Sequence, residues 1–382
     1  MRTLFLHIGF HKTGSTSLQL ALSRAGDQLL AEGFEFASLG KKGNSSGAID
    51  VRKSDGRVSY ALNDRFTELL GSSRSDRVIV SAEHLSFLHE AGQVEAVRRI
   101  CRQYFDHTVV IVYLRRQDRQ AISFKQQAAR GCERDRSSSS KLLGHAPGAF
   151  PSLTDSVRTY YDYCAKLQLW SESFGEEALR VRRFNAADLK GGDIVSDFTS
   201  LLGLKAELEP CRINECVSRK EFLLSHRLIG LGLDPRQLNK LKPLMQKGET
   251  RLVPARNTAV EFFQQFSVSN RELNRLFLPH PSGQAFSDDF SSYPEVGNDQ
   301  LEFADIAEWS ADFFRAGLRE PYALRDALLI EPLDRLSEAV GPESVEGQQI
   351  LSLRQCLGET AAVTPEGKNW WARLRQRKRH GR

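Results

Sequence analysis

The sequence has no paired-cysteine motif. Its six cysteines are scattered along 382 residues, and no two of them form a Cys-x-x-Cys pair. This distribution gives no sign of a structural zinc site or of a disulfide framework. It is typical of buried or free thiols in a reducing compartment. The six are Cys101, Cys132, Cys164, Cys211, Cys216 and Cys356.

Long apolar runs are absent too. No stretch approaches the roughly 20 apolar residues that a membrane-spanning helix needs. The N-terminus is apolar, but His7 and Lys12 interrupt it before it could serve as the core of a signal peptide. We therefore expect a cytoplasmic protein.

The body of the chain also lacks a charge excess. The formal net charge is +5, yet six basic residues lie within the last ten positions, so the remainder is close to neutral. Composition thus gives no case for a nucleic-acid-binding domain, and we expect no nucleic-acid partner. In residues 366–382, Trp370 and Trp371 precede the basic run. This tail is either a peripheral contact with a membrane surface or a disordered terminus.

One stretch near the N-terminus has a strong pattern. Residues 4–8 are typical of a buried strand, residues 9–14 form a glycine-bounded loop, and a helix is expected to open at Ser15. A loop of this kind presents free backbone N–H groups and the positive end of a helix dipole to a phosphate. We expect a nucleotide phosphate here. The alternative is a serine- and threonine-rich helix cap that binds nothing.

The residue order in the loop argues against a nucleoside-triphosphate site. Such a loop places Lys directly after its second glycine, whereas Ser15 follows Gly14 here. The run from Lys12 through Thr13, Gly14, Ser15 and Thr16 to Ser17 closely resembles the phosphosulfate loop of sulfotransferases that use 3′-phosphoadenosine-5′-phosphosulfate (PAPS). The resemblance implies that Lys12 reaches the oxygen bridging phosphate and sulfate, and that the following amides and hydroxyls hold the 5′-phosphate. His11 stands where the family more usually has Pro.

The next predicted strand, residues 77–81, is followed by Ala82, Glu83 and His84. Because ligands gather at the carboxyl ends of parallel strands, Glu83 and His84 should lie beside the loop. A partly buried Glu at this point suits a general base. Ser81-Ala82-Glu83 resembles the Ser-Ser-Glu of sulfotransferases that act on carbohydrate and protein hydroxyls, which implies that Glu83 is the base. His is the base in the cytosolic small-molecule branch, so His84 competes, and helix capping is a third role for Glu83.

Residues 108–114 are the strongest strand of the chain, and their β-branched run is typical of a central parallel strand. Arg115 follows directly, with Ser123 eight residues on. This pair resembles the family's 3′-phosphate site, where an arginine fork and a serine hydroxyl hold the phosphate. Arg116 and Arg119 either join that site or are solvated helix charges.

The other expected elements are less specific. We expect helices at 15–32, 93–104 and 154–174, a short strand at 34–36, and a strand at 178–184 that joins the sheet. Residues 130–150 are either a lid over a substrate or unstructured surface. Capping boxes are predicted at Ser218 with Glu221 and at Thr258 with Glu261. Asn270 lies on an apolar helix face and should be hydrogen-bonded internally. Asn214-Glu215-Cys216 resembles an Asn-Glu-Ser stretch in bacterial members of the family.

These expectations combine into an α/β protein. We expect a doubly wound parallel sheet with a P-loop-like phosphosulfate-binding loop in residues 1–290, a C-terminal helical extension in 291–365, and the basic tail in 366–382. The resemblance implies a PAPS-dependent sulfotransferase that moves a sulfuryl group in line to an acceptor hydroxyl, leaves 3′,5′-adenosine bisphosphate (PAP) and needs no metal. The acceptor is expected to be a carbohydrate or glycolipid. Two alternatives are a P-loop-type small-molecule or sugar kinase using ATP, and a non-catalytic nucleotide-binding module.

Overall fold

The computed structural model describes residues 1–54, 57–130, 137–209, 217–233, 238–239, 250–306, 309 and 331–359. At its centre lies a five-stranded sheet in the order β2-β5-β1-β6-β7, in which every neighbouring pair is parallel. The predicted parallel sheet is therefore confirmed, and each predicted strand lies within two residues of its observed position. The strands are β1 (Thr3–His7), β2 (Phe34–Phe36), β5 (Arg77–Ser81), β6 (His107–Leu114) and β7 (Leu179–Arg183).

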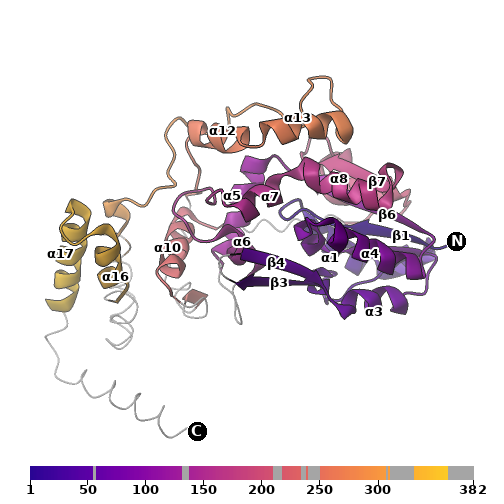
Figure 1. Ribbon diagram of the computed structural model, residues 1–382, viewed down its shortest axis with the longest axis horizontal. Coiled ribbons are helices and arrows are strands. Elements are labelled where there is room, and N and C mark those ends of the chain that lie inside the picture. The colour runs from indigo at the N-terminus through magenta and orange to yellow at the C-terminus, as the bar shows by residue number, and fades with distance from the viewer. Residues whose placement is uncertain are drawn as a thin grey trace, which may run out of the picture.

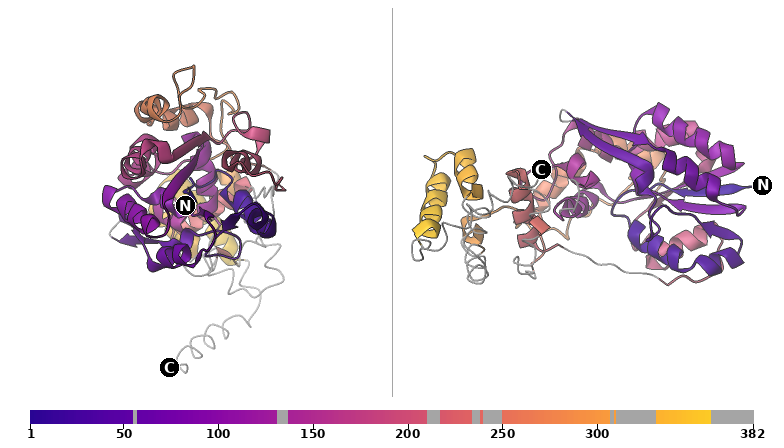
Figure 2. Two further views of the ribbon diagram at one scale, coloured as in Figure 1. Left: turned by 90° about the vertical axis from the view of Figure 1, so that its right-hand side faces the viewer. Right: turned by 90° about the horizontal axis from the view of Figure 1, so that it is seen from below.

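Helices cover both faces of this sheet, as Figure 2 shows. On one face, Ile111 and Tyr113 of β6 pack in a core with α1 (Ser15–Arg24), α2 (Gly26–Ala31) and α9 (Ile194–Leu202). On the other, Val110 and Val112 join a larger core with α4 (Ala91–Tyr104) and α8 (Tyr163–Phe174). Successive side chains of a strand point to opposite faces. The uninterrupted apolar run of β6 thus follows from burial on both sides.

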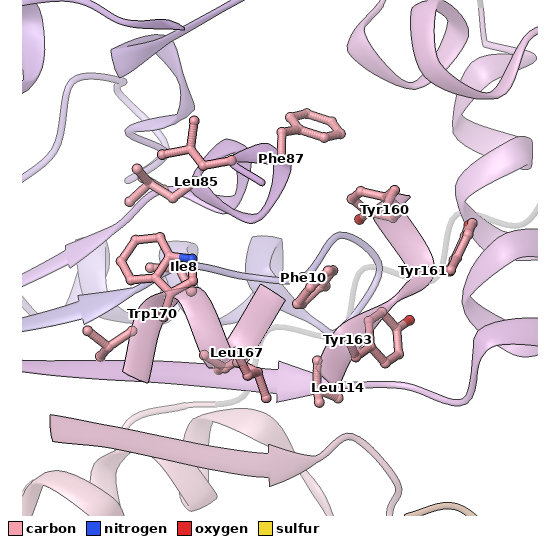
Figure 3. Packing of buried hydrophobic residues seen from close by; sticks show 14 of the residues in the cluster. Ile8, Phe10, Leu85, Phe87, Leu114, Tyr160, Tyr161, Tyr163, Leu167 and Trp170 are labelled. Carbon is pink, nitrogen blue, oxygen red and sulfur yellow. The ribbon is translucent and has the colours of Figure 1, made fainter. Parts of the chain in front are cut away.

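Two long predicted helices are each broken in two. The helix expected at 15–32 is interrupted at Ala25, where α1 ends and α2 follows. The helix expected at 154–174 divides into α7 (Asp155–Tyr161) and α8, because the side chain of Asp162 accepts a hydrogen bond from the backbone of Ala165 and caps the second helix. The aromatic side chains of these two helices are buried: Tyr160, Tyr161, Tyr163 and Trp170 (Figure 3).

One of the two predicted capping boxes is wrong. The helix α12 (Arg256–Gln264) begins before Thr258, so that residue lies within the first turn and cannot cap it. At α10 (Arg219–Gly230), by contrast, the Ser218 hydroxyl accepts from the Glu221 amide as predicted.

A β-hairpin was not predicted. The strands β3 (Ile49–Ser54) and β4 (Arg57–Leu62) pair antiparallel beside the main sheet, between η1 (Ser46–Ala48) and α3 (Asp64–Ser72). Ile49 and Tyr60 are buried and join it to the larger core. An Asp55-Gly56 dipeptide stands between two alternating runs in the sequence. That pattern is a recognised hairpin signal and could have found it.

In Figure 1, α10, α16 and α17 lie on the side of the molecule away from the N-terminus, and α12 and α13 lie along the top of the view. α12 packs on α5, and α13 packs on α8. The pair α16 and α17 lies at the end of the molecule opposite the N-terminus. Among the described helices, none is both long and apolar enough to cross a membrane. The helices whose bounds have not yet been given are α5 (Gln117–Ala128), α6 (Ser138–Leu143), α13 (Ser267–Leu276), α16 (Glu331–Val340) and α17 (Val345–Glu359). The other 3-10 helices are η2 (Glu83–Phe87), η3 (Glu176–Ala178) and η4 (Lys190–Gly192).

Some predicted features lie outside the described residues. These are the Asn214-Glu215-Cys216 stretch, Cys132 and Cys211, and the tail that begins at residue 366. Of the segment expected at 130–150 to be a loop, the described part contains the short helix α6.

Candidate active site

The predicted phosphate loop follows β1 and is anchored on β6. The backbone amides of Ile8 and Phe10 donate to the carbonyls of Ile111 and Tyr113, each at 3.1 Å. The Phe10 ring packs edge-on against Tyr160 and Tyr163, as Figure 3 shows. The loop therefore starts from a buried and hydrogen-bonded base.

The turn of the loop aims a helix N-terminus outward. Lys12 and Gly14 both have left-handed backbone conformations, with φ of 63° and 79°. The Thr13 hydroxyl donates to the Phe10 carbonyl at 2.6 Å and closes the turn. α1 then begins at Ser15, and first-turn amides of a helix have no helical carbonyl to bond. They form the kind of site that binds an anion.

Two loop residues differ in role from what the family resemblance implies. The Thr13 hydroxyl is used inside the loop, where it donates to the Phe10 carbonyl. His11 is buried and stacks on Phe124, and its Nδ1 lies 2.9 Å from the Tyr160 hydroxyl. Burial holds the pKa of His11 well below its usual range. His11 is therefore a neutral anchor for the loop.

Glu83 begins η2, directly after β5, and contacts the loop. The Ser15 hydroxyl donates to its Oε2 at 2.5 Å. A Cβ on Gly9 would come within 3.2 Å of the Glu83 backbone, so glycine is what lets the two segments pack this closely. Burial raises the pKa of the Glu83 carboxyl, against the opposing effects of the Ser15 hydrogen bond, the Lys12 charge and Asn44. A carboxylate with a raised pKa is suited to accept a proton.

His84 lies next to Glu83, but burial shifts its pKa in the opposite direction. Its Nε2 is 3.1 Å from the Ser138 hydroxyl, and its ring centroid is 5.5 Å from that of His11. Burial lowers the pKa of His84 to about 4. The imidazole is thus neutral near pH 7 and a weak base, which favours Glu83 for proton abstraction.

An open cleft of about 680 Å³ lies along the other side of the loop. Gly14 and Ser17 line it at the start of α1, Arg115 lines it at the end of β6, and Phe184 lines it after β7. The Arg115 guanidinium donates to the Lys12 carbonyl at 3.3 Å and lies 5.9 Å from the centre of the Phe184 ring. The structure therefore brings Arg115 to the loop, as predicted from its position at a strand end.

Ser123 is less well placed than Arg115. It is half-buried on α5, and the described residues that line the cleft do not include it. Thr16 is exposed at the first turn of α1.

The neighbouring arginines have separate roles. Arg116 is not a solvated helix charge. It is buried, pairs with both oxygens of Asp118 at 2.8 Å, and donates to the carbonyls of Ser287 and Asp289. The Tyr293 hydroxyl completes this network by donating to Asp118 at 2.6 Å. The network holds one wall of the cleft in place, because Ser287 and Asp289 line it.

Arg119 is exposed and lines the cleft, so its position fits both of the alternatives predicted for it. Arg183 also lines the cleft and was not predicted as a site residue. Its guanidinium donates to the carbonyls of Ala285 and Leu278. Arg183 is the last residue of β7, so the strand-end argument that identified Arg115 could have found it.

The acidic residues at the cleft do not assemble a metal site. Asp193 is the N-cap of α9, where its side chain accepts from the amides of Val195 and Ser196. Within the described part of the chain, no three His, Cys, Asp or Glu side chains gather closely enough to hold a metal ion.

Comparison with known proteins adds little to this geometry. No protein-family model and no curated protein matches the chain. The crystal structure of a sulfotransferase from Alicyclobacillus acidocaldarius aligns with 74% of this chain and 98% of its own, at 16% sequence identity and a TM-score of 0.39. At that similarity neither activity nor residue roles carry over.

Proposed function

We propose that the protein transfers a sulfuryl group from PAPS to an acceptor hydroxyl and releases PAP. The observation that carries the proposal is the contact between Ser15 and Glu83. It joins an anion-binding helix start to a half-buried carboxylate with a raised pKa. A base beside a phosphate loop is what a transfer to a hydroxyl requires.

The donor would lie along the loop and the cleft. The amides of residues 13–17, with the hydroxyls of Thr16 and Ser17, would hold the 5′-phosphate at the positive end of α1. Arg115 is the candidate for the 3′-phosphate, because guanidinium groups bind phosphate with two parallel hydrogen bonds. Arg119 is a second cation at the same cleft. Ser123 stays a weaker candidate for that phosphate, since it does not line the cleft.

The transfer itself is a single displacement at sulfur. The acceptor oxygen forms a bond to sulfur while the bond from sulfur to the bridging oxygen breaks. Glu83 takes the hydroxyl proton, and the leaving electron pair stays on the phosphate of PAP, where Lys12 stabilises the growing negative charge. No covalent intermediate is needed. His84 is not the base in this proposal, because its lowered pKa makes it the weaker proton acceptor.

The acceptor and the setting of the reaction rest on the family resemblance. A carbohydrate or glycolipid hydroxyl follows from the likeness of Ser81-Ala82-Glu83 to the carbohydrate branch. The division into a 1–290 α/β domain, a 291–365 helical extension and a 366–382 tail belongs to the same proposal. So do the cytoplasmic location and a peripheral membrane contact through the tail.

Two other functions are less well supported. An ATP-dependent kinase would place Lys where Ser15 stands, and would hold magnesium with an Asp after β5, where Glu83 and His84 are found. A non-catalytic module would bind the nucleotide without turnover. The raised pKa of Glu83 at the loop favours a reaction over binding alone.

The proposed function is tested by following label from [³⁵S]PAPS into a panel of polysaccharides and glycolipids. The wild type should transfer label to at least one of them and release PAP. Glu83→Gln should reduce transfer about 10²- to 10⁴-fold, the usual contribution of a general base. His84→Asn should stay within about tenfold of the wild type. A larger loss in His84→Asn than in Glu83→Gln would assign the base to His84, and binding of PAP without transfer would point to the module.

A further inference from the structure

The Ser15 side chain has two possible partners and one proton. In the structure its hydroxyl donates to Oε2 of Glu83 at 2.5 Å. Ser15 is also the first residue of α1, where its neighbours would receive the 5′-phosphate under the proposed function. A serine hydroxyl donates a single hydrogen bond. It cannot donate to the carboxylate and to a phosphate at the same time.

The backbones that carry Ser15 and Glu83 are closely packed. Ser15 is buried. The Glu83 backbone is packed against Gly9, within about 3.2 Å of where a Cβ would stand. Phosphate on the loop could therefore change the partner of Ser15 by a side-chain rotation, without a movement of β1 or η2.

We propose that Ser15 is a positioning residue that couples occupancy of the phosphate loop to the freedom of the Glu83 carboxylate. Without donor, Ser15 occupies Oε2. When a phosphate binds the loop, the hydroxyl turns to it, and the carboxylate loses a hydrogen bond that had stabilised its charge and becomes a better proton acceptor for the acceptor hydroxyl. This inference rests on the proposed function, because it needs a phosphate-bearing donor.

The groups around Glu83 determine whether loss of the Ser15 hydrogen bond raises or lowers the pKa of its carboxyl. Lys12 faces Glu83 from the loop, Asn44 donates to it from the segment after β2, and Tyr160 approaches from α7. Its neighbour His84 and the nearby His11 both have lowered pKa values, so neither adds a positive charge near pH 7. Burial raises the pKa of Glu83, and the Ser15 hydrogen bond lowers it. Loss of that bond should raise the pKa and make Glu83 a stronger base once donor is bound.

Ser15 differs from the other hydroxyls of the loop. Thr16 is exposed, and Ser17 lines the nucleotide cleft. Thr16→Ala therefore removes a loop hydroxyl without removing the contact to Glu83. Because the Thr16 hydroxyl is also a proposed phosphate contact, this variant is compared with the wild type only in free protein and at saturating PAP.

The test is a direct titration of the Glu83 carboxyl by ¹³C NMR, identified by its absence in Glu83→Gln. Wild type, Ser15→Ala and Thr16→Ala are titrated with and without saturating PAP. In free protein, Ser15→Ala should raise the pKa of Glu83 by about one unit, and Thr16→Ala should leave it unchanged. PAP should raise the pKa in wild type and in Thr16→Ala by more than in Ser15→Ala. Ser15→Cys, a similar volume with a weaker donor, should give intermediate values if Ser15→Ala does not fold.

The outcomes separate the coupling from the proposed function. If PAP binds and its effect on Glu83 is equal in wild type and Ser15→Ala, the coupling is wrong and the donor site stands. An unchanged pKa in free Ser15→Ala would also overturn the coupling. If PAP does not bind the wild type at all, the proposed function fails and the coupling fails with it.

Discussion

At the scale of single residues, Lys12 combines an unusual backbone conformation with the central electrostatic role in the proposed reaction. Its φ of 63° is one that side-chain-bearing residues rarely adopt, at a cost of about 1 kcal/mol. The Thr13 and Arg115 hydrogen bonds to the loop carbonyls hold this turn. Alanine has the same backbone restriction as lysine, so Lys12→Ala removes the ammonium group without relaxing the loop as glycine would.

We expect Lys12→Ala to lose about 10²- to 10³-fold in turnover, because one preorganised donor at a developing charge is worth that much. Its unfolding transition should match that of the wild type. The measurement is the rate of label transfer from PAPS at saturating donor. Lys205→Ala removes the same charge from an exposed position and serves as control. Wild-type turnover in Lys12→Ala would remove Lys12 from the mechanism.

The positions of these residues in the fold could be predicted from the sequence, but their side-chain contacts could not. Glu83 and Arg115 were identified because both follow strands, and parallel strands bring their carboxyl ends to one edge. The inward turn of the Thr13 hydroxyl and the bond between Ser15 and Glu83 depend on rotamers and on segments 68 residues apart. No local pattern specifies such contacts.

At the scale of elements, the start of α5 is joined to the wall of the cleft by a buried ion pair. Arg116 binds Asp118 and two carbonyls of the segment after α13, and its guanidinium lies 4.1 Å from the centre of the Phe290 ring. Asp118→Asn keeps the shape of the side chain but leaves the buried guanidinium without its counter-charge. Breaking one partner of a buried pair typically costs about 3–5 kcal/mol.

We expect Asp118→Asn to lower the free energy of unfolding by about 3–5 kcal/mol, measured by urea denaturation. Glu95→Gln removes the partner of Arg98 in a surface pair and should cost less than about 1 kcal/mol. Equal effects of the two substitutions would show that the buried pair does not hold the segment.

The elements themselves were largely predictable, for physical reasons that vary along the chain. β5 and β6 were found because strands buried on both faces are continuously apolar. Asn270 was expected to be bonded internally, and its amide exchanges hydrogen bonds with Gln117. The breaks at Ala25 and Asp162 were missed because the apolar spacing continues across them. The β3–β4 hairpin was missed because its strands are half exposed.

At the scale of the whole molecule, buried neutral histidines determine the response to acid. Burial lowers the pKa of His7 to about 4, of His84 to about 4 and of His226 to about 2, and it holds the pKa of His11 well below the usual value. In the unfolded chain each would titrate near 6.5. Below that pH the unfolded state binds protons that the folded state excludes, so stability falls as pH falls.

We expect the free energy of unfolding to decrease between pH 6.5 and 4 by up to about 1.4 kcal/mol per pH unit for each such histidine. The raised pKa of Glu83 acts in the opposite direction but is a single group. Urea denaturation at intervals of one pH unit measures the slope. His7→Asn should reduce the slope by the equivalent of about one proton. A flat profile down to pH 5 would contradict the assignment.

The central claim is that the loop and the arginine-lined cleft bind a 3′-phosphorylated adenosine nucleotide. Calorimetric titration tests it most directly, with PAP and separately with ATP and magnesium. We expect micromolar binding of PAP, weak binding of ATP, and loss of PAP binding in Arg115→Ala while Lys205→Ala binds normally. Tight, magnesium-dependent binding of ATP with indifference to PAP would contradict the proposed donor site and make the protein a kinase.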